Sequence, residues 1–440
     1  MLQDAQDQGL SGATASAVAL YDAAIRAASL GHGDVIGRLD AAAADAPAFV
    51  MPLLAKAWLL ALSRDPLFAG RVRTLVQTVA GMEMNDRERS HFAALAKAAE
   101  GARGAAIAKL DTHLMHWPRD ILAHLIALLF DLSQGRVRWM RERAARALPN
   151  FPRDMPGHAA LLSFHGFGLE ENGDYARAEQ ESREAAQLEP HSWFAHHTVS
   201  HVMEMTDRPE EGIGWMASRE PFWATEDHPN RDHLWWHRAL YHLDLGQHNA
   251  ALALYDGPYL ASEKPLAMSL TNASALLWRL DTLGVDVVAR WQALLPRWQG
   301  HADGRWLVFA DLHAIMAELR SGAEAQAEQR LSSMRATAAS NAEVANTYAE
   351  VGVPLAEGLC AYHRGAYQAA VSHLLPARFD LWRIGGSLAQ RDVIDWTLAE
   401  AAVRAGQRDI AISLANERLA LRPLSHINLR FLSRAEQLAE

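Results

Sequence analysis

A short pattern of glycine and alanine recurs along the chain and constrains its fold more than any other feature. A glycine is followed by a polar or small residue, then a small or aromatic residue, and by an alanine five positions after the glycine. The clearest copies are Gly173 with Ala178 and Gly365 with Ala370, and the weaker ones are Gly101 with Ala106, Gly246 with Ala251, Gly322 with Ala327 and Gly406 with Ala411. Glycine permits a tight turn, and alanine lets two helices approach closely. The pattern therefore predicts antiparallel helix pairs.

Several copies end in a proline, which stops the second helix, at Pro118, Pro190 and Pro423. A glycine turn, a small residue in the second helix and a terminal proline are typical of tetratricopeptide repeats, whose period is about 34 residues. The copies are unevenly spaced, so we expect degenerate repeats with inserted loops at 219–230 and 256–269. The fold class predicted is an all-α, tetratricopeptide-like helix-pair superhelix, an α-solenoid without sheet.

One continuous helical-repeat domain is expected over residues 1–440, because each helix pair needs neighbours to bury its apolar face. Its best repeats lie at 157–255 and 350–423, and residues 1–15 are expected to be loosely ordered. No signal peptide or transmembrane run is evident, which favours a soluble cytoplasmic protein without a membrane partner. The net charge of −10 argues against nucleic-acid binding. The single cysteine, Cys360, is expected to be a buried structural thiol.

The chain holds 21 histidines and 14 tryptophans, and the placement of a few histidines suggests a site. His197, His201 and Glu204 are spaced i, i+4 and i+7, which puts them on one face of a helix. We expect that face to line the concave side of the superhelix. Imidazoles one turn apart can bind a divalent metal (zinc, iron or manganese) or exchange protons, with the carboxylate orienting one ring. The alternative is a set of buried structural histidines.

A second histidine pair occurs in the next repeat, at His233 and His237, again one turn apart. Neighbouring first helices lie side by side in a repeat stack, so the two pairs are expected to converge on one pocket. Trp235 and Trp236 lie between the members of this pair, and core packing is the expected role of at least one of them.

Other polar residues are weaker candidates for ligand binding. His91 follows Asn85-Asp86, where we expect Asp86 to cap a helix, and His165 stands where a repeat normally has an apolar residue. Gly385-Gly386-Ser387 marks a helix start that could hold an anion or be an ordinary capped helix. Gln390, Arg391 and Asp392 follow it as ligand-binding candidates, and Trp236 is a further candidate. Asn272, Arg279, Asp281 and His313 lie in apolar helices, where ion pairs are expected.

Taken together, these motifs resemble those of the tetratricopeptide repeat protein 38 family, found in animals and bacteria. The resemblance covers about residues 15–425 and rests on Arg87-Glu88 with His91, His197-Thr198-Val199-Ser200-His201 with Glu204-Met205, His233 with Trp236-His237, and Gly385-Gly386-Ser387 with Ala389-Gln390-Arg391-Asp392. It implies a helical-repeat fold with these motifs in one site, but no particular reaction. Two departures, Leu234 and Leu388, stand where the family often has polar residues and could alter the polarity of the pocket.

Two functions follow from these observations. In the first, a pocket lined by His, Glu and Trp binds a small molecule in the concave channel. Catalysis there is hydrolytic or lyase-type, by His197, His201, Glu204, His233 and His237, and Arg391 pairs with a substrate anion. In the alternative, the chain is a scaffold that binds a peptide or protein in its groove. The sequence leaves the oligomeric state open, and a homo-oligomer is compatible with it.

Overall fold

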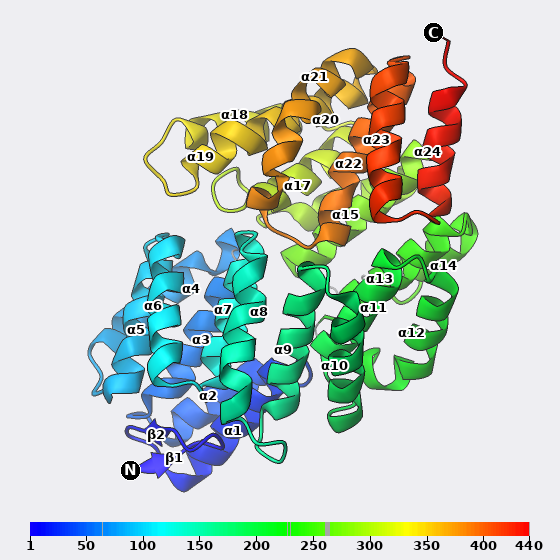
Figure 1. Cartoon of the computed structure of the whole chain (residues 1–440). Helices are drawn as coiled ribbons and strands as arrows, with labels where there is room; N and C mark the ends of the chain where they lie inside the picture. Colours follow the sequence, from blue (N-terminus) through cyan, green and yellow to red (C-terminus); the bar gives the residue numbers. More distant parts are fainter. Residues whose placement is uncertain (64, 227, 229, 260–264, 440) are drawn as a thin grey trace. The chain divides into compact units, whose positions relative to one another are not determined.

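The protein is described by a computed structural model covering residues 1–63, 65–226, 228, 230–259 and 265–439 (Figure 1). Almost every regular element in these residues is a helix, which confirms the expected all-α fold class. The chain divides into two compact units: unit 1 comprises Met1–Val202 and Arg219–Arg231, and unit 2 comprises Met203–Ser218 and Asp232–Glu440. That residues 1–440 form one continuous repeat domain stays a prediction.

The elements have the following bounds, as labelled in Figure 1. Unit 1 contains β1 (Leu2–Gln3), β2 (Gly9–Leu10), α1 (Ala15–Leu30), α2 (Val35–Asp45), α3 (Val50–Leu62), η1 (Pro66–Phe68), α4 (Ala69–Ala80), α5 (Asp86–Ala99), α6 (Arg103–His116), α7 (Ile121–Ser133), α8 (Val137–Ala147), η2 (Leu148–Asn150), α9 (His158–Glu171) and α10 (Tyr175–Leu188). Residues of both units occur in α11 (Trp193–Met205), α12 (Pro209–Trp223) and α13 (Arg231–Asp244). Unit 2 contains α14 (His248–Asp256), α15 (Ala267–Thr282), α16 (Val288–Leu294), η3 (Leu295–Trp298), α17 (Val308–Arg320), α18 (Glu324–Ala338), α19 (Ala345–Thr347), η4 (Tyr348–Gly352), α20 (Val353–His363), α21 (Tyr367–Ala377), η5 (Arg378–Ile384), α22 (Leu388–Arg404), α23 (Arg408–Leu421) and α24 (His426–Glu436).

The glycine pattern forms the turns between paired helices, as expected. In unit 1, Gly173 has a φ of 81° and joins α9 to α10, and in unit 2, Gly365 has a φ of 75° and joins α20 to α21. This left-handed conformation favours glycine. The partner helices then lie in contact: a Cβ at Gly166 of α9 would stand 2.4 Å from the Ser182 hydroxyl of α10. Ala178 is fully buried at this contact.

In unit 2, the first helices of successive pairs form a contiguous inner layer. Helix α15 packs against α17 and α22, and α20 also packs against α17 and α22. The second helices α18, α21 and α23 each pack on the first helix that precedes them. The centre of α15 is therefore buried almost completely, and polar residues on it, such as Asn272 and Arg279, lie inside the core. This inner layer positions the polar residues described below.

The N-terminal segment differs from what the sequence suggests. Residues 1–15 are expected to be loosely ordered, whereas Leu2–Gln3 and Gly9–Leu10 pair as antiparallel strands β1 and β2, and Asp4 is buried. The expectation of no strand is therefore wrong for these two short segments. Two residues per strand are too few to show a period-2 pattern, and the pairing depends on the turn between them.

Two helix boundaries also correct the sequence analysis. Helix α5 is capped by Asn85 and not by Asp86, since the Asn85 side chain accepts from the Glu88 amide and the Glu88 side chain accepts in return. Helix α12 runs to the buried Trp223, so the first part of the expected loop 219–230 is helical. Of the expected loop 256–269, Asp256 is the last residue of α14 and residues 267–269 are the first turn of α15. Residues 257–259 and 265–266 lie outside helices, and residues 260–264 are outside the described part.

In the part of the chain that the structure describes, every helix is too short or too polar to span a lipid bilayer. The single cysteine, Cys360 of α20, is buried as expected, and its burial raises the pKa of the thiol to about 11. A thiol with a raised pKa is poorly nucleophilic at neutral pH, which fits a structural role.

Candidate functional site

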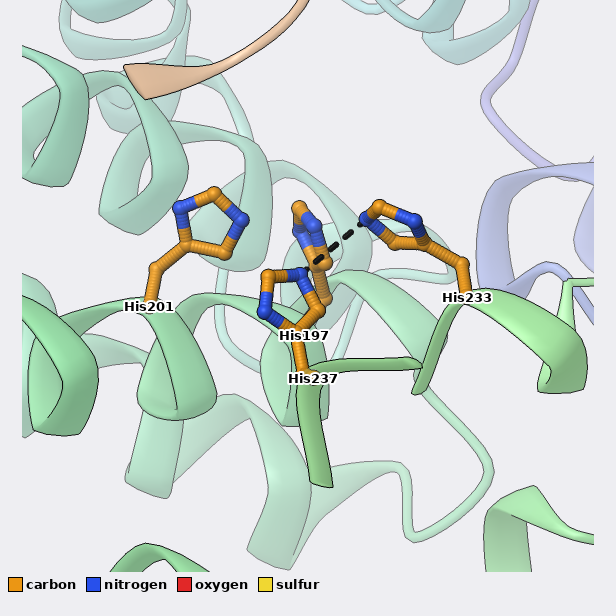
Figure 2. Close-up of side chains that lie close together, drawn as sticks. All are labelled: His197, His201, His233 and His237. Carbon is orange, nitrogen blue, oxygen red and sulfur yellow. Dashed lines mark hydrogen bonds between the residues drawn. The ribbon is translucent and has the colours of Figure 1, made fainter. Parts of the chain in front are cut away.

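Helix α11 carries the first histidine pair on a single buried face. His197 and His201 lie one turn apart, with ring centroids 4.3 Å from each other, and both are almost fully buried (Figure 2). The ring of Trp193, one turn earlier, stacks on His197 at 4.4 Å with an interplanar angle of 15°. Phe167 of α9 forms a T-shaped contact with each imidazole. Aromatic contacts therefore hold both rings in place.

Two carboxylates of α9 accompany this pair within unit 1. The Glu170 Oε2 atom lies 3.4 Å from Nδ1 of His201, and both side chains are fully buried. Glu170, Glu171 and His201 each offer one ligand atom, and these atoms lie within 4.8 Å of one another. Neither glutamate stood out in the sequence, because adjacent acidic residues at the end of a helix are common on protein surfaces.

Helix α13 carries the second histidine pair, which lies in unit 2. His233 and His237 direct their Nε2 atoms at each other, 3.1 Å apart (dashed line in Figure 2). Trp236 is fully buried and its ring stacks on His233 at 5.3 Å. Nδ1 of His237 lies 3.4 Å from Oε2 of Glu204, the last candidate on α11. The structure therefore brings Glu204, His237, His233 and Trp236 together.

The other ring nitrogen of His233 continues the contacts toward α22. Nδ2 of Asn272, on α15, lies 2.6 Å from Nδ1 of His233. Nε2 of Gln390 donates to Oδ1 of Asn272 at 3.1 Å, and Oε1 of Gln390 accepts from the backbone amide of Ser387, also at 3.1 Å. The Gly-Gly-Ser motif is thus a capped helix start, and its glutamine is linked to His233 through Asn272. The sequence marked Gln390 as a candidate but assigned Asn272 to ion pairs.

Glu204 borders a small cavity on its other side. Arg422 places its Nη1 atom 3.8 Å from Oε1 of Glu204 and also pairs with Asp207 and Asp244. The cavity has a volume of about 20 Å³. Its lining includes Glu204, Asp244, Arg279, Asp392, Arg418 and Arg422. This is room for about one water molecule among charged groups.

Of the charged residues after the Gly-Gly-Ser motif, Asp392 lines this cavity with a partly exposed side chain. Asp392 pairs with Arg279 at 3.2 Å and with Arg418 at 2.7 Å, which confirms the ion-pair role expected of Arg279. Burial opposes the charge of Asp392, but these arginines lower its pKa to about 2. Arg391 is buried, and its guanidinium donates to the carbonyl of Gly386.

His91 belongs to a separate buried cluster in unit 1 that centres on one carboxylate. Oδ2 of Asp120 lies 2.8 Å from Nη1 of Arg87, 2.9 Å from Nε2 of His91 and 3.2 Å from Nε2 of His113. Its Oδ1 atom accepts from the Ala123 amide at 3.0 Å and so caps α7. We call Arg87, His91, His113 and Asp120 the Asp120 cluster.

The electrostatics of the Asp120 cluster are those of a closed ion-pair network. Burial raises the free energy of the Asp120 charge, but His91 and Arg87 hold the pKa of this carboxyl well below its usual range. Burial, together with His91, lowers the pKa of His113 to about 4. His91, His113 and Asp120 also have metal-ligand spacing, within 4.8 Å. However, Arg87 already occupies the carboxylate, so a cation bound there would face an adjacent positive charge.

His165 contacts a glutamate and belongs to neither histidine pair. Its Nδ1 atom lies 2.6 Å from Oε2 of Glu181, across the contact between α9 and α10. The contact with Glu181 explains why a polar residue occupies a position that is usually apolar in such repeats. The sequence pattern had marked His165 for ligand binding, which the structure does not test.

No protein-family model matches the chain. Among solved structures, the chain is similar to the one titled "Human IFIT1 dimer with PPP-AAAA", with 15% sequence identity over 87% of this chain and 94% of that one, and a TM-score of 0.32. These values are too low to carry an argument about function. The fold class therefore rests on the helices themselves, and it is that of an all-α, tetratricopeptide-like helical-repeat protein.

Proposed function

We propose that this protein binds a small molecule at the histidines of α11 and α13 and transfers protons there, in a hydrolytic or lyase-type reaction. One observation carries the proposal: Glu204, His237 and His233 follow one another within hydrogen-bonding range in a buried setting. A carboxylate beside an imidazole orients the ring and stabilises its protonated form, which is the arrangement that general acid–base catalysis uses.

The continuity of α11 supports placing His197 and His201 at the same site. Glu204 lies three residues after His201, and residues so spaced share a helix face. The Glu204 carboxylate contacts His237 of α13, and this contact supports including the helix face of the first pair in the proposed site. In the proposed site, His197 and His201 complete the set of proton donors and acceptors drawn in Figure 2.

The cavity beside Glu204 supports the hydrolytic form of the reaction. It has room for about one water molecule, and one of its walls is the carboxylate that contacts His237. A water molecule held there would lie next to a carboxylate–imidazole pair able to accept its proton. Arg422 and its paired acids keep the wall polar without leaving an unpaired charge.

A second candidate function is binding of one divalent metal ion, such as zinc, iron or manganese. The four imidazoles of Figure 2 are the proposed ligands. The Nε2 atoms of His233 and His237 are 3.1 Å apart, close to the separation of about 3.3 Å between two nitrogen ligands of tetrahedral zinc. Glu204 would then be the carboxylate that orients a metal-bound imidazole.

Two measurements decide between these candidates. The first is the metal content of purified protein before and after EDTA treatment. Stoichiometric zinc, iron or manganese that is lost in a folded His197→Ala/His201→Ala variant supports the metal candidate. The matched control is His116→Ala/His373→Ala, at exposed or partly exposed histidines. Sub-stoichiometric metal, together with an unchanged melting temperature in added divalent ions, overturns it.

The second measurement is hydrolysis of p-nitrophenyl acetate, an activated ester that reports on histidine acid–base groups. We expect turnover above the protein-free rate in the presence of EDTA, and a loss of at least about tenfold in His237→Gln, because proton transfer by a positioned side chain is worth about 100-fold or more. Equal rates in the wild type and in His237→Gln would overturn the acid–base proposal.

Several expectations from the sequence accompany these proposals. The proposal includes membership of the tetratricopeptide repeat protein 38 family. It also includes a cytoplasmic location, a homo-oligomeric state and the absence of a nucleic-acid partner. The role of Arg391 toward a substrate anion is likewise proposed. The scaffold function is the alternative that a failure of both measurements would favour.

A further inference from the structure

We propose that the side-chain amides of Asn272 and Gln390 are positioning residues that fix the proton of neutral His233 on Nε2. Neither residue belongs to the acid–base group itself. The two amides belong to a row of hydrogen bonds that all run in one direction. The row starts at the backbone N–H of Ser387, at the start of α22, and ends at Glu204. The inference rests on the proposed function for its catalytic consequence, but the position of the proton can be measured without any reaction.

The direction of the row is set at the start of α22. The backbone N–H of Ser387 can only donate, and the atom 3.1 Å from it is Oε1 of Gln390. The reciprocal bond of the capping box, from the backbone N–H of Gln390 to the Ser387 hydroxyl, holds residue 390 at the helix start. The amide orientation of Gln390 is therefore fixed, with its Nε2 directed away from the helix start.

Gln390 then fixes the orientation of Asn272. Nε2 of Gln390 donates to Oδ1 of Asn272 at 3.1 Å, so a reversed Asn272 amide would place two N–H donors face to face. Nδ2 of Asn272 consequently faces Nδ1 of His233, 2.6 Å away. Asn272, Gln390 and His233 are all almost fully buried, and these amides are in place to bond one another instead of bulk water.

The proton of His233 follows from this contact. A neutral imidazole has one donor and one acceptor nitrogen, and Nδ1 must accept from Asn272, so the hydrogen resides on Nε2. That hydrogen points at Nε2 of His237, 3.1 Å away. His237 accepts there and carries its own hydrogen on Nδ1, facing Glu204 at 3.4 Å. Every bond of the row thus points toward Glu204.

This row of hydrogen bonds affects the choice between proton transfer and metal binding. A histidine that binds a metal through Nε2 must carry its hydrogen on Nδ1, and in His233 that hydrogen would face the N–H of Asn272. The two amides therefore favour proton transfer over metal coordination at His233. A variant that reverses the direction of these hydrogen bonds should favour metal coordination at His233 instead.

The test is Gln390→Glu, which keeps the capping box because a glutamate at this position also accepts from the Ser387 amide. Both glutamate oxygens are acceptors, so Asn272 must turn its Nδ2 toward residue 390 and its Oδ1 toward His233. We expect the hydrogen of His233 to move from Nε2 to Nδ1. The measurement is the pair of ring ¹⁵N chemical shifts in ¹⁵N-histidine-labelled full-length protein, with the His233 signals assigned by His233→Gln.

A second variant and a control keep the test decisive if Gln390→Glu fails to fold. Asn272→Asp places an acceptor directly against Nδ1 of His233 and should move the hydrogen in the same way. Asn428→Asp is the matched control: it is a buried asparagine of α24 that bonds Arg418, and it should leave the His233 shifts unchanged. Zinc affinity should rise at least about tenfold in Asn272→Asp and stay constant in Asn428→Asp.

The outcomes separate this inference from the proposed function. Wild-type His233 with its hydrogen on Nδ1, or no change of tautomer in a folded Gln390→Glu or Asn272→Asp protein, overturns the inference. The expected tautomers combined with no ester hydrolysis leave the inference standing and overturn the acid–base proposal. A residue with a purely structural role would lower stability without moving the hydrogen between the two ring nitrogens.

Discussion

Two buried histidine groups use similar residue types in opposite ways. In unit 1, Arg87, His91 and His113 all point at one carboxylate, Asp120. In unit 2, His233 and His237 point at each other, and the Glu204 carboxylate lies at the end of the row, next to His237. The first arrangement converges on a single charge, and the second passes hydrogen bonds from one group to the next.

The difference shows how to separate a structural histidine from a functional candidate. A carboxylate that accepts from three side chains and one amide has its bonding capacity filled, so the Asp120 cluster has little left to offer a ligand. A row of imidazoles keeps donors and acceptors that can exchange roles when a proton moves. Burial alone does not distinguish the groups, because both are almost fully buried.

Acidification is expected to separate the two units most strongly. In unit 1, burial lowers the pKa of His113, His124 and His196 to about 4 from an ordinary 6.5. Each histidine therefore contributes to the free energy of unfolding above pH 6.5, and this contribution is lost as the pH falls through about 4. By pH 5 the loss is about 2 kcal/mol for each histidine. Burial raises the pKa of Asp4 to about 6. Protonation of Asp4 between pH 7 and pH 5 therefore adds about 1 kcal/mol to the free energy of unfolding, which offsets only part of the loss at the histidines.

In unit 2 the same change of pH acts in the other direction. Burial lowers the pKa of His313 to about 4, but it raises the pKa values of Asp311 and Asp395 to about 6. These carboxyls add stability as the pH falls from 7 to 5, which offsets the loss at His313. Amide hydrogen exchange at pH 7 and pH 5 measures both units, and protection lost first in unit 2 would contradict the comparison.

Removal of the Asp120 carboxylate is expected to have the next largest effect. Asp120→Ala leaves Arg87, His91 and His113 buried without their common acceptor and should lower the free energy of unfolding by about 3–5 kcal/mol. Urea denaturation, with hydrogen exchange of α5, α6 and α7, measures the loss. Asp281→Ala is the control, because its partly exposed pair with Arg320 should be worth less than about 1 kcal/mol. An equal loss in both variants would refute the central role of Asp120.

A smaller effect on stability but a large one on activity is expected from Glu204→Gln. The substitution keeps the size of the side chain while it removes the charge beside His237. Ester hydrolysis should fall at least about tenfold, since the carboxylate no longer stabilises the protonated ring. Glu318→Gln removes a buried carboxylate paired with Arg330 and should leave the rate unchanged. Equal rates in the two variants would remove Glu204 from the proposed site.

The smallest effect is expected at the margin of the Asp120 cluster. Asp4 lies 3.3 Å from Arg87, a weaker contact than the 2.8 Å between Arg87 and Asp120. Asp4→Asn should therefore change the free energy of unfolding at pH 7 by less than about 1 kcal/mol, because the burial that raises the pKa of Asp4 offsets its attraction to Arg87. Urea denaturation at pH 7 gives the value, and a loss as large as that of Asp120→Ala would mean that the N-terminal segment is part of the cluster.

The sequence alone determined the helix pairs and the histidine pairs within each helix. Gly173 and Gly365 were predicted to form interhelical turns and do so with positive φ. The spacing of His197, His201 and Glu204 was predicted to place them on one face of a helix, and α11 spans all three. These features depend on interactions between residues a few positions apart, which is why a local pattern reveals them.

Only the tertiary structure decided which groups meet. Asp120 follows His91 by 29 residues, and Asn272 follows His233 by 39, so no local pattern connects them. Gln390 lies 118 residues beyond Asn272, and it reaches this side chain only because α15 and α22 pack side by side. The sequence thus set which residues each helix presents, whereas the packing of helices distant in the chain set their partners, because those contacts form only when the core excludes water.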